Sequence, residues 1–329
     1  PSPFPMAGAC SDAALHSVRR MNPGYEALVS GVALWPDPDR ALLAVEGPRA
    51  LAALNGLLSA DVESLDVGEA VLSFLLTAKG RPVALPVVVR RAQDILLDVS
   101  RAALPGVVDH FGVYLPPRLA RVSPLDDLHR VSVLGPGALS AVDAAEWAPE
   151  AIRVERAAED GGGVDLYIDR AYGTDEIGAR LAVEGVAVAS QADYEVWRIE
   201  LGMPVYGVDV TTDNLPQETG LVPRAVSFDK GCYTGQEVVA RIHYRGHVNR
   251  ILRGVRYPQG HDGPSLMAGS ELVREGRAVG TVTSACESPR FGQIGLAYVR
   301  HELGPGDDVA AQEQPSAPLM VADLPFTLT

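Results

Sequence analysis

The residues best suited to chemistry lie in one segment, 228–241, of this 329-residue chain. It reads Phe-Asp-Lys-Gly-Cys-Tyr-Thr-Gly-Gln-Glu-Val-Val-Ala-Arg, with Gly231 and Gly235 on either side of Cys232 and Tyr233. Glycine takes backbone conformations that other residues avoid. We therefore predict that Cys232 lies on a tight loop and not inside a regular element.

Two roles compete for Cys232. Lys230 and Arg241 are cationic, and close to the sulfur they would favour the thiolate, which attacks electrophiles and takes part in redox chemistry. In the alternative, Cys232 is a small buried apolar residue, as a lone cysteine often is. Gln236 and Glu237 add polar groups at the start of the following segment. The sequence leaves both roles open.

No metal site is predicted. His243 and His247 are four residues apart, a spacing that suits a metal pair on a helix, but Gly246 between them argues against a helix. The three cysteines are Cys10, Cys232 and Cys286. They form no CxxC pair, so we expect neither a zinc site nor a disulfide scaffold, and a reducing compartment fits best.

Composition narrows the class of protein. The formal net charge of −14 argues against nucleic acid as the main partner. No apolar run approaches the roughly 20 residues of a membrane span, and residues 1–11 lack the features of a signal peptide, so we expect a cytoplasmic protein. Residues 217–256 nevertheless hold seven basic and three acidic side chains. They predict either a site for a small anion or a solvated basic surface.

The elements that position these residues predict two α+β units and a β domain. In the first unit we expect strands near 41–45, 71–77, 82–90 and 94–99, with helices over about 48–60 and 102–111. In the second we expect strands near 131–134, 152–156 and 164–168, with helices from 138 and over 174–183. Gly47-Pro48 and Gly135-Pro136 mark the same strand-to-helix step in each unit. A helix over 191–202 follows, and short strands after 250 predict a small barrel or sandwich.

The cysteine segment resembles the signature of the YgfZ family, which is related to the glycine-cleavage T-protein. Lys-Gly-Cys-Tyr-Thr-Gly-Gln-Glu followed by Val-Val-Ala-Arg matches without interruption. Residues 197–207 and 215–218 are similar to segments that precede it in the family, and 279–297 is similar to the T-protein barrel. The resemblance implies a three-lobed ring around a central cavity that binds tetrahydrofolate. We divide the ring into 15–120 with 190–250, a ferredoxin-like unit of 121–189, and a barrel of 251–329.

The resemblance also implies residues for the folate. Glu200 matches the carboxylate expected to bind the pterin, and Tyr194 falls where an aromatic residue lines the site. Tyr206 and Trp197 are further candidates. In the alternative, Tyr194 and Trp197 are core residues of an amphipathic helix and Glu200 is a surface acid.

One departure separates the chain from the T-proteins. Their pair of aspartates, which supplies the acid–base group for the reacting folate nitrogen, is replaced by Ala84 and Leu85. The resemblance therefore implies a tetrahydrofolate-binding factor that assists synthesis or repair of iron–sulfur clusters in client or assembly proteins, with Cys232 as the functional thiol. Whether it catalyses a chemical step stays open. The alternatives are an aminomethyl transferase of the glycine-cleavage type and a protein scaffold that binds no folate.

Overall fold

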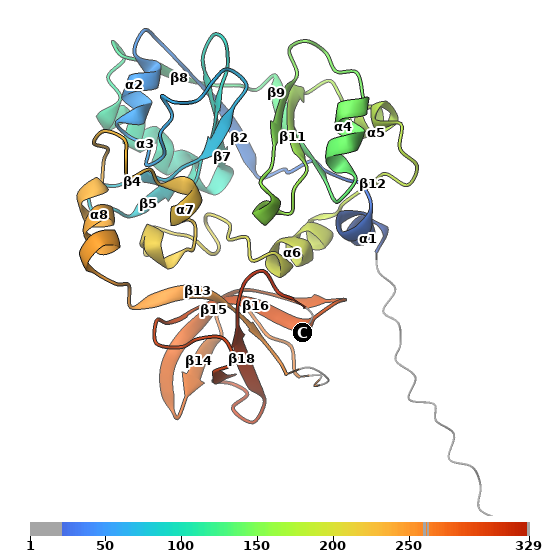
Figure 1. The fold of residues 1–329 in the computed structure, drawn as a ribbon, viewed down its shortest axis with the longest axis vertical. Coiled ribbons are helices and arrows are strands. Elements are labelled where there is room, and N and C mark those ends of the chain that lie inside the picture. Colours follow the sequence, from blue (N-terminus) through green and yellow to red (C-terminus); the bar gives the residue numbers. More distant parts are fainter. Residues whose placement is uncertain (1–21, 259–260, 262, 328–329) are drawn as a thin grey trace, which may run out of the picture.

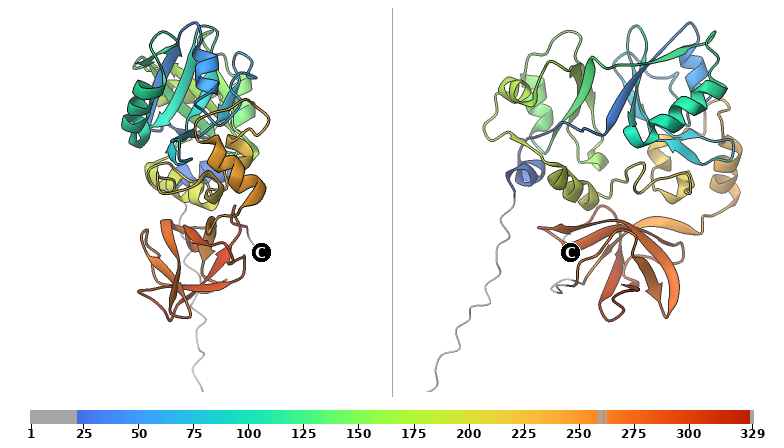
Figure 2. Two further views of the ribbon diagram at one scale, coloured as in Figure 1. Left: turned by 90° about the vertical axis from the view of Figure 1, so that its left-hand side faces the viewer. Right: turned by 180° about the vertical axis from the view of Figure 1, so that it is seen from behind.

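The computed structural model describes residues 22–258, 261 and 263–327. They form three lobes, which are two α+β units side by side and a closed six-stranded barrel below both (Figure 1). An edge-on view shows that the lobes lie nearly in one plane (Figure 2). The predicted architecture of two α+β units and a C-terminal barrel is confirmed. Cys10 lies outside the described residues.

The first unit is an antiparallel sheet with the strand order β3-β6-β7-β2-β8. Its strands are β2 (Arg40–Glu46), β3 (Ala70–Leu72), β6 (Val87–Arg90), β7 (Ile95–Ser100) and β8 (Arg121–Pro124). Helices α2 (Ala50–Asn55) and α3 (Leu104–Tyr114) cover one face of this sheet. Leu54, Leu97 and Val107 are among the residues buried between sheet and helices.

The second unit is a sheet with the strand order β10-β11-β9-β1-β12. Its strands are β1 (Ala33–Trp35), β9 (Leu128–Leu134), β10 (Ile152–Glu155), β11 (Val164–Asp169) and β12 (Ala187–Val188). Helices α4 (Ala138–Ala144) and α5 (Thr174–Leu181) pack on one face. The sheets also meet each other, since Leu42 and Leu96 of the first pack in one cluster with Tyr167 of the second.

The two predicted Gly-Pro turns each place a glycine at a position that other residues do not suit. Gly47 has φ +145° and Gly135 has φ +100°, both in the region that favours glycine. A Cβ atom would lie 2.6 Å from the Leu119 carbonyl oxygen at Gly47 and 2.5 Å from the Gly31 carbonyl oxygen at Gly135. Each turn therefore needs glycine, because its backbone passes directly against another backbone segment.

The sheets divide the chain differently from the predicted ranges at two places. β1 lies in the range assigned to the first unit but pairs with β9 and β12 of the second. β8 begins the range assigned to the second unit but pairs with β2 of the first. Each sheet thus draws one strand from the other unit's predicted range.

The predicted strands 71–77 and 82–90 are each interrupted. β4 (Leu75–Leu76) and β5 (Pro82–Ala84) separate from β3 and β6 and form a small hairpin of their own. Pro86 lies at the break; it has no backbone N–H to donate, although its carbonyl oxygen still accepts from Ser73.

Helices connect the units to the barrel. They are α1 (Pro23–Ser30), α6 (Gln191–Glu200), α7 (Val222–Ala225) and α8 (Gln236–Arg245), with short 3₁₀ turns at Arg101–Ala103, Ala158–Asp160 and Pro216–Glu218. Ser190 caps α6 in a capping box with Asp193. α6 packs on two barrel strands and so forms the seam between the upper lobes and the barrel.

The barrel closes in the order β13-β16-β15-β14-β17-β18. Its strands are β13 (Arg250–Arg256), β14 (Glu271–Arg274), β15 (Arg277–Ser288), β16 (Gly292–Arg300), β17 (Asp308–Ala311) and β18 (Pro318–Ala322). In the part of the chain that the structure describes, no helix has the length and apolar character to cross a bilayer.

Candidate functional site

A central cavity of about 490 Å³ lies between the two α+β units. Its walls come from the β1–β2 connection, the edge of the first sheet, strands β10 and β11, and the helices α6 and α7. Tyr194 and Tyr206, two of the predicted folate residues, line it, whereas Trp197 and Glu200 do not.

Aromatic side chains form one wall of the cavity. Tyr194 on α6 stacks on Trp35 at the end of β1, with ring centroids 4.6 Å apart and planes 6° apart. Trp197 lies 5.8 Å from Tyr194 but is only 4% exposed, in the cluster beneath. Tyr194 therefore lines the cavity, and Trp197 supports it from the core. This wall suits a flat heterocyclic ring.

A buried ion pair stands in the same cavity. Asp165 on β11 accepts hydrogen bonds from the Ser132 hydroxyl and from Arg156, whose Nη1 lies 3.2 Å from Oδ1. Burial alone would raise the pKa of Asp165, but Arg156 and Arg130 outweigh it and hold this pKa below its usual value. Among the described residues, the buried Nε atoms of Arg156 and Arg130 have no hydrogen-bond partner. The cavity therefore offers an ionised carboxylate and guanidinium donors side by side.

A second charged network forms one boundary of the cavity. Asp98, fully buried on β7, accepts from Arg130 Nη1 at 2.8 Å, from the Tyr167 hydroxyl at 3.0 Å and from Arg40. Arg130 also donates to Asp37 at 2.6 Å. The network fixes Arg40 and Arg130 between the two sheets.

Glu200 points away from the cavity. Its carboxylate accepts from the Tyr25 hydroxyl at 2.5 Å and from the Ser288 hydroxyl, and Arg290 lies 3.4 Å away. The residue is 2% exposed. These contacts join α6 to α1 and to the barrel, and they raise the pKa of Tyr25 through burial and the neighbouring carboxylate. The structure thus gives Glu200 a place in the seam and not beside a cavity ligand.

Cys232 is exposed on the loop between α7 and α8, so the alternative of a buried apolar cysteine is wrong. It lines neither large cavity. Tyr233 anchors the loop from below at 6% exposure. Of the two glycines, Gly235 is the constrained one, with φ +84° and 2.6 Å from an added Cβ to the Thr77 carbonyl oxygen. Gly231 has open space around it and a φ that other residues can adopt.

Lys230 holds the cysteine loop in place. Its Nζ atom donates to the carbonyl oxygens of Asn55 at 2.6 Å, Leu58 at 2.7 Å and Ala60 at 2.7 Å, and to the Asn55 side chain at 3.0 Å. Burial lowers the pKa of Lys230 to about 8. The ammonium group is thus engaged with the end of α2. Arg241, Gln236 and Glu237 lie on α8, with Arg241 and Glu237 exposed.

The helix α8 ends between the two histidines of the doubted metal pair. It includes His243 and ends at Arg245, before Gly246 and His247. His243 stacks on Phe228, with ring centroids 3.9 Å apart, and so braces the cysteine loop. Within the described residues, no group of three or more His, Cys, Asp or Glu side chains is arranged to hold a metal ion.

Ala84 and Leu85, which replace the two aspartates of the T-proteins, have different surroundings. Ala84 is fully buried, whereas Leu85 lines the central cavity and gives it an apolar contact.

Sequence reasoning missed Trp35, Asp165, Arg156 and Arg130. A signal for Asp165 was present, since it is the one charged side chain in the otherwise apolar run 164–168, which forms a buried strand. A charge in such a run needs a partner, and Arg156 and Arg130 supply it.

Similarities to known proteins agree with this geometry. Residues 250–327 match the family described as the glycine cleavage T-protein C-terminal barrel domain. Over 291 residues the chain is 29% identical to a Mus musculus protein named iron–sulfur cluster assembly factor IBA57, mitochondrial, covering 80% of this chain and 76% of that one. Over 305 residues it is 27% identical to the tRNA-modifying protein YgfZ of Yersinia pseudotuberculosis serotype O:1b, covering 88% and 91%.

A solved structure shares the whole architecture. The aminomethyltransferase T of the glycine cleavage system from Bartonella henselae aligns with a TM-score of 0.79 over 92% of this chain and 88% of that one. The sequences are 22% identical, so this likeness shows the fold.

Proposed function

We propose that this chain, a YgfZ-like relative of the glycine-cleavage T-protein, binds a reduced folate and assists the synthesis or repair of iron–sulfur clusters in client enzymes. The relatives named for iron–sulfur assembly and for YgfZ match most of the chain. The observation that carries the folate proposal is the cavity in which the Trp35–Tyr194 stack and the Asp165–Arg156 pair occur together.

The cavity fits a folate in size and in chemistry. Its volume of about 490 Å³ lies in the range of small-molecule sites. Tyr194 and Tyr206 would contact the pterin ring, and the Asp165 carboxylate would accept hydrogen bonds from the pterin N–H groups. Arg224 on α7, which also lines the cavity, would hold a carboxylate of the glutamate tail. When bound, tetrahydrofolate would supply a carrier of one-carbon units.

In this proposal Asp165 replaces Glu200 as the pterin ligand. Glu200 is used by Tyr25, Ser288 and Arg290, and its release into the cavity would leave those groups without their acceptor. A buried donor without an acceptor costs about 1–3 kcal/mol.

Cys232 would act at the surface. It is exposed and lines neither large cavity, so its reaction partner would be a client or assembly protein that docks on the loop. Lys230 would fix the height of this loop above α2, and Arg241 would supply nearby positive charge. Free thiols at Cys232 and Cys286 suit a reducing compartment such as the cytoplasm.

The two alternatives lose support. An aminomethyl transferase needs a proton-transfer group at the reacting nitrogen, and Leu85 presents a hydrocarbon to the cavity instead. A scaffold that binds no folate would be favoured by a cavity filled with side chains, whereas this cavity is open.

Calorimetric titration with folinic acid, a stable reduced folate, tests the proposal. We expect micromolar binding to the wild type and at least tenfold weaker binding to Asp165→Asn and to Tyr194→Ala, a loss of at least about 1.4 kcal/mol. Glu200→Gln is the matched control and should bind like the wild type, with thermal melting to verify that each variant is folded. Absence of binding to the wild type would overturn the folate proposal. Selective loss in Glu200→Gln would restore Glu200 as the ligand.

A further inference from the structure

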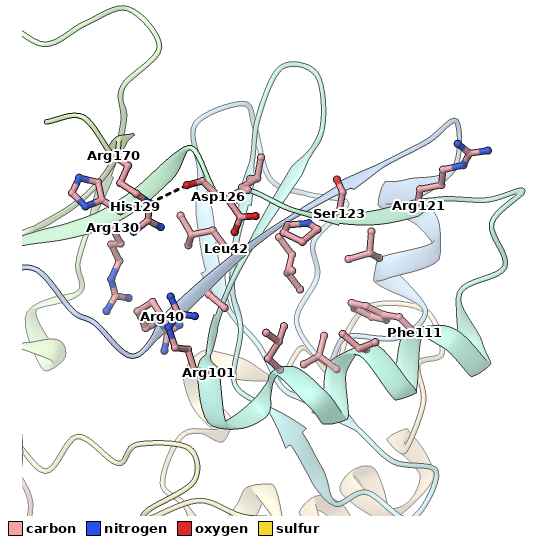
Figure 3. Close-up of a pocket in the computed structure, with 18 of the residues that line it drawn as sticks. Arg40, Leu42, Arg101, Phe111, Arg121, Ser123, Asp126, His129, Arg130 and Arg170 are labelled. Atoms are coloured by element: carbon pink, nitrogen blue, oxygen red, sulfur yellow. Dashed lines mark hydrogen bonds between the residues drawn. The ribbon is translucent and has the colours of Figure 1, made fainter.

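A second and larger cavity lies on the outer side of the first unit. It is a groove of about 880 Å³ between α3 and the strands β2 and β8 (Figure 3). Arg40 and Arg101 lie at one end of the groove, and Arg121 lies toward the other. The cysteine loop contributes nothing to its lining.

The lining is cationic although the chain as a whole is strongly acidic. Five arginines and two aspartates are among the described residues that line the groove: Arg40, Arg101, Arg121, Arg130, Arg170, Asp37 and Asp126. The charges of Arg40 and Arg130 are balanced by Asp98 and Asp37. Asp126 offsets one charge of the other three, so five arginines against three aspartates leave the groove a surplus of two positive charges in a protein of net charge −14.

Arg101 presents a free guanidinium end. Its Nε atom donates to the Pro38 carbonyl oxygen at 3.0 Å, which holds the side chain in place. In the described part of the chain, neither of its terminal nitrogens has a hydrogen-bond acceptor. A guanidinium held through Nε with its outer nitrogens free is suited to a carboxylate or phosphate.

His129 also lines the groove. Its Nε2 atom is buried and has no partner among the described residues. Burial lowers the pKa of His129, and the charge of Arg170 lowers it further. The ring is therefore neutral at pH 7 and adds no charge to the groove.

The rest of the lining is apolar. Leu104, Val107 and Phe111 extend along α3, and Leu42 and Val122 face them from the sheet. Val108, on the same helix, is 56% exposed at the margin. An apolar surface of this length beside free guanidinium groups is complementary to a molecule with a hydrocarbon or aromatic body and an anionic group.

We propose that this groove is a second ligand site, which binds a small organic anion with an apolar body. Its carboxylate or phosphate pairs with Arg101, and its apolar portion lies along α3. The site is separate from the proposed folate cavity and stands whether or not folate binds there.

Two dyes with the same aromatic body test the proposal. 1-Anilinonaphthalene-8-sulfonate carries an anionic group, and N-phenyl-1-naphthylamine is its neutral counterpart. We expect fluorescence titration of the full chain to give at least fivefold tighter binding of the anionic dye. Arg101→Gln should remove that preference and leave the affinity for the neutral dye unchanged. Equal affinity of the wild type for both dyes would overturn the proposal.

Two valines on α3 provide matched variants for the apolar part. Val108 lines the groove, whereas Val113 is 73% exposed and does not. Val108→Asp should weaken both dyes at least fivefold, and Val113→Asp should not, with near-ultraviolet circular dichroism verifying the fold. If Val108→Asp and Arg101→Gln both bind the anionic dye as tightly as the wild type does, the proposal is overturned. A tenfold loss in Tyr194→Ala without any loss in Arg101→Gln would also overturn it, because it would place the dye in the central cavity.

Discussion

At the scale of single residues, buried charge is concentrated where the two α+β units meet. Asp165, Asp98 and Arg130 are all less than a tenth exposed, and each is paired. A paired buried charge contributes little net stability, but removal of one partner is costly because the other remains buried. Burial of these charges beside the cavity costs free energy, and their pairing offsets that cost.

The first prediction at this scale concerns Asp165 and acid. Its folded-state pKa is lowered, so its contribution to stability is fully present above the ordinary aspartate pKa and is lost as the pH falls through the folded value. At pH 7 we expect Asp165→Asn to lower the free energy of unfolding by about 3 kcal/mol. Urea denaturation should show this difference narrowing below about pH 4. A difference independent of pH would contradict the ionised pair.

The second prediction at the residue scale concerns Lys230. Replacement by methionine leaves three carbonyl oxygens without a donor and should lower the free energy of unfolding by about 2 kcal/mol. The chain offers a matched control, because Lys79 is its one other lysine and is exposed. Lys79→Met should leave the free energy unchanged in the same denaturation experiment. Equal effects of the two substitutions would mean that the contacts of Lys230 contribute nothing.

At the scale of elements, α8 starts where Gly235 packs on the β4–β5 hairpin. An added Cβ would lie 2.6 Å from the Thr77 carbonyl oxygen, and the φ of +84° is unfavourable for any other side chain. We expect Gly235→Ala to lower the free energy of unfolding by about 1–3 kcal/mol. Gly231→Ala, five residues before the first residue of the same helix and with nothing near an added Cβ, should be neutral in thermal melting. If Gly235→Ala leaves the free energy of unfolding unchanged, the β4–β5 hairpin can move away from the added methyl group without loss of stability.

The elements also show what the sequence could and could not predict. The loop around Cys232 was predictable, since the glycines on either side of it are local features, whereas the helix α8 after it was not predicted. The orientation of Glu200 was not. Six residues along an α-helix rotate a side chain by about 600°, which places Tyr194 and Glu200 roughly 120° apart around α6. The two side chains therefore leave the helix in different directions, and Tyr194 alone lines the cavity. A resemblance that matches residues one by one does not contain this angle.

Contacts between residues distant in sequence could not be predicted for a different reason. Lys230 bonds to carbonyl oxygens near residue 55, about half the chain away, and nothing in the local sequence indicates which backbone it meets. The same holds for the short strands β1 and β8, whose three and four residues do not indicate which sheet they join. The prediction of two α+β units and a barrel was confirmed. The boundaries between the units depend on which strands pair, and only the structure shows that.

At the scale of the whole molecule, the barrel is attached on the side of α6 opposite to the central cavity. Glu200 accepts from Tyr25 of α1 and from Ser288 at the end of β15, so one carboxylate joins a linking helix and the barrel. The same helix carries Tyr194, which stacks on Trp35 in the cavity wall. α6 thus serves the barrel seam with one side chain and the cavity with another.

The network of Asp98, Arg40 and Arg130 has one further consequence. Arg40, Arg130 and Asp37 line both the central cavity and the outer groove, so the two spaces are back to back with a single layer of charge between them. A molecule that attracts either guanidinium from one side alters the electrostatic field on the other. Thermodynamic linkage then makes the effect mutual: whatever factor an occupant of the groove imposes on affinity in the cavity, the occupant of the cavity returns in equal measure.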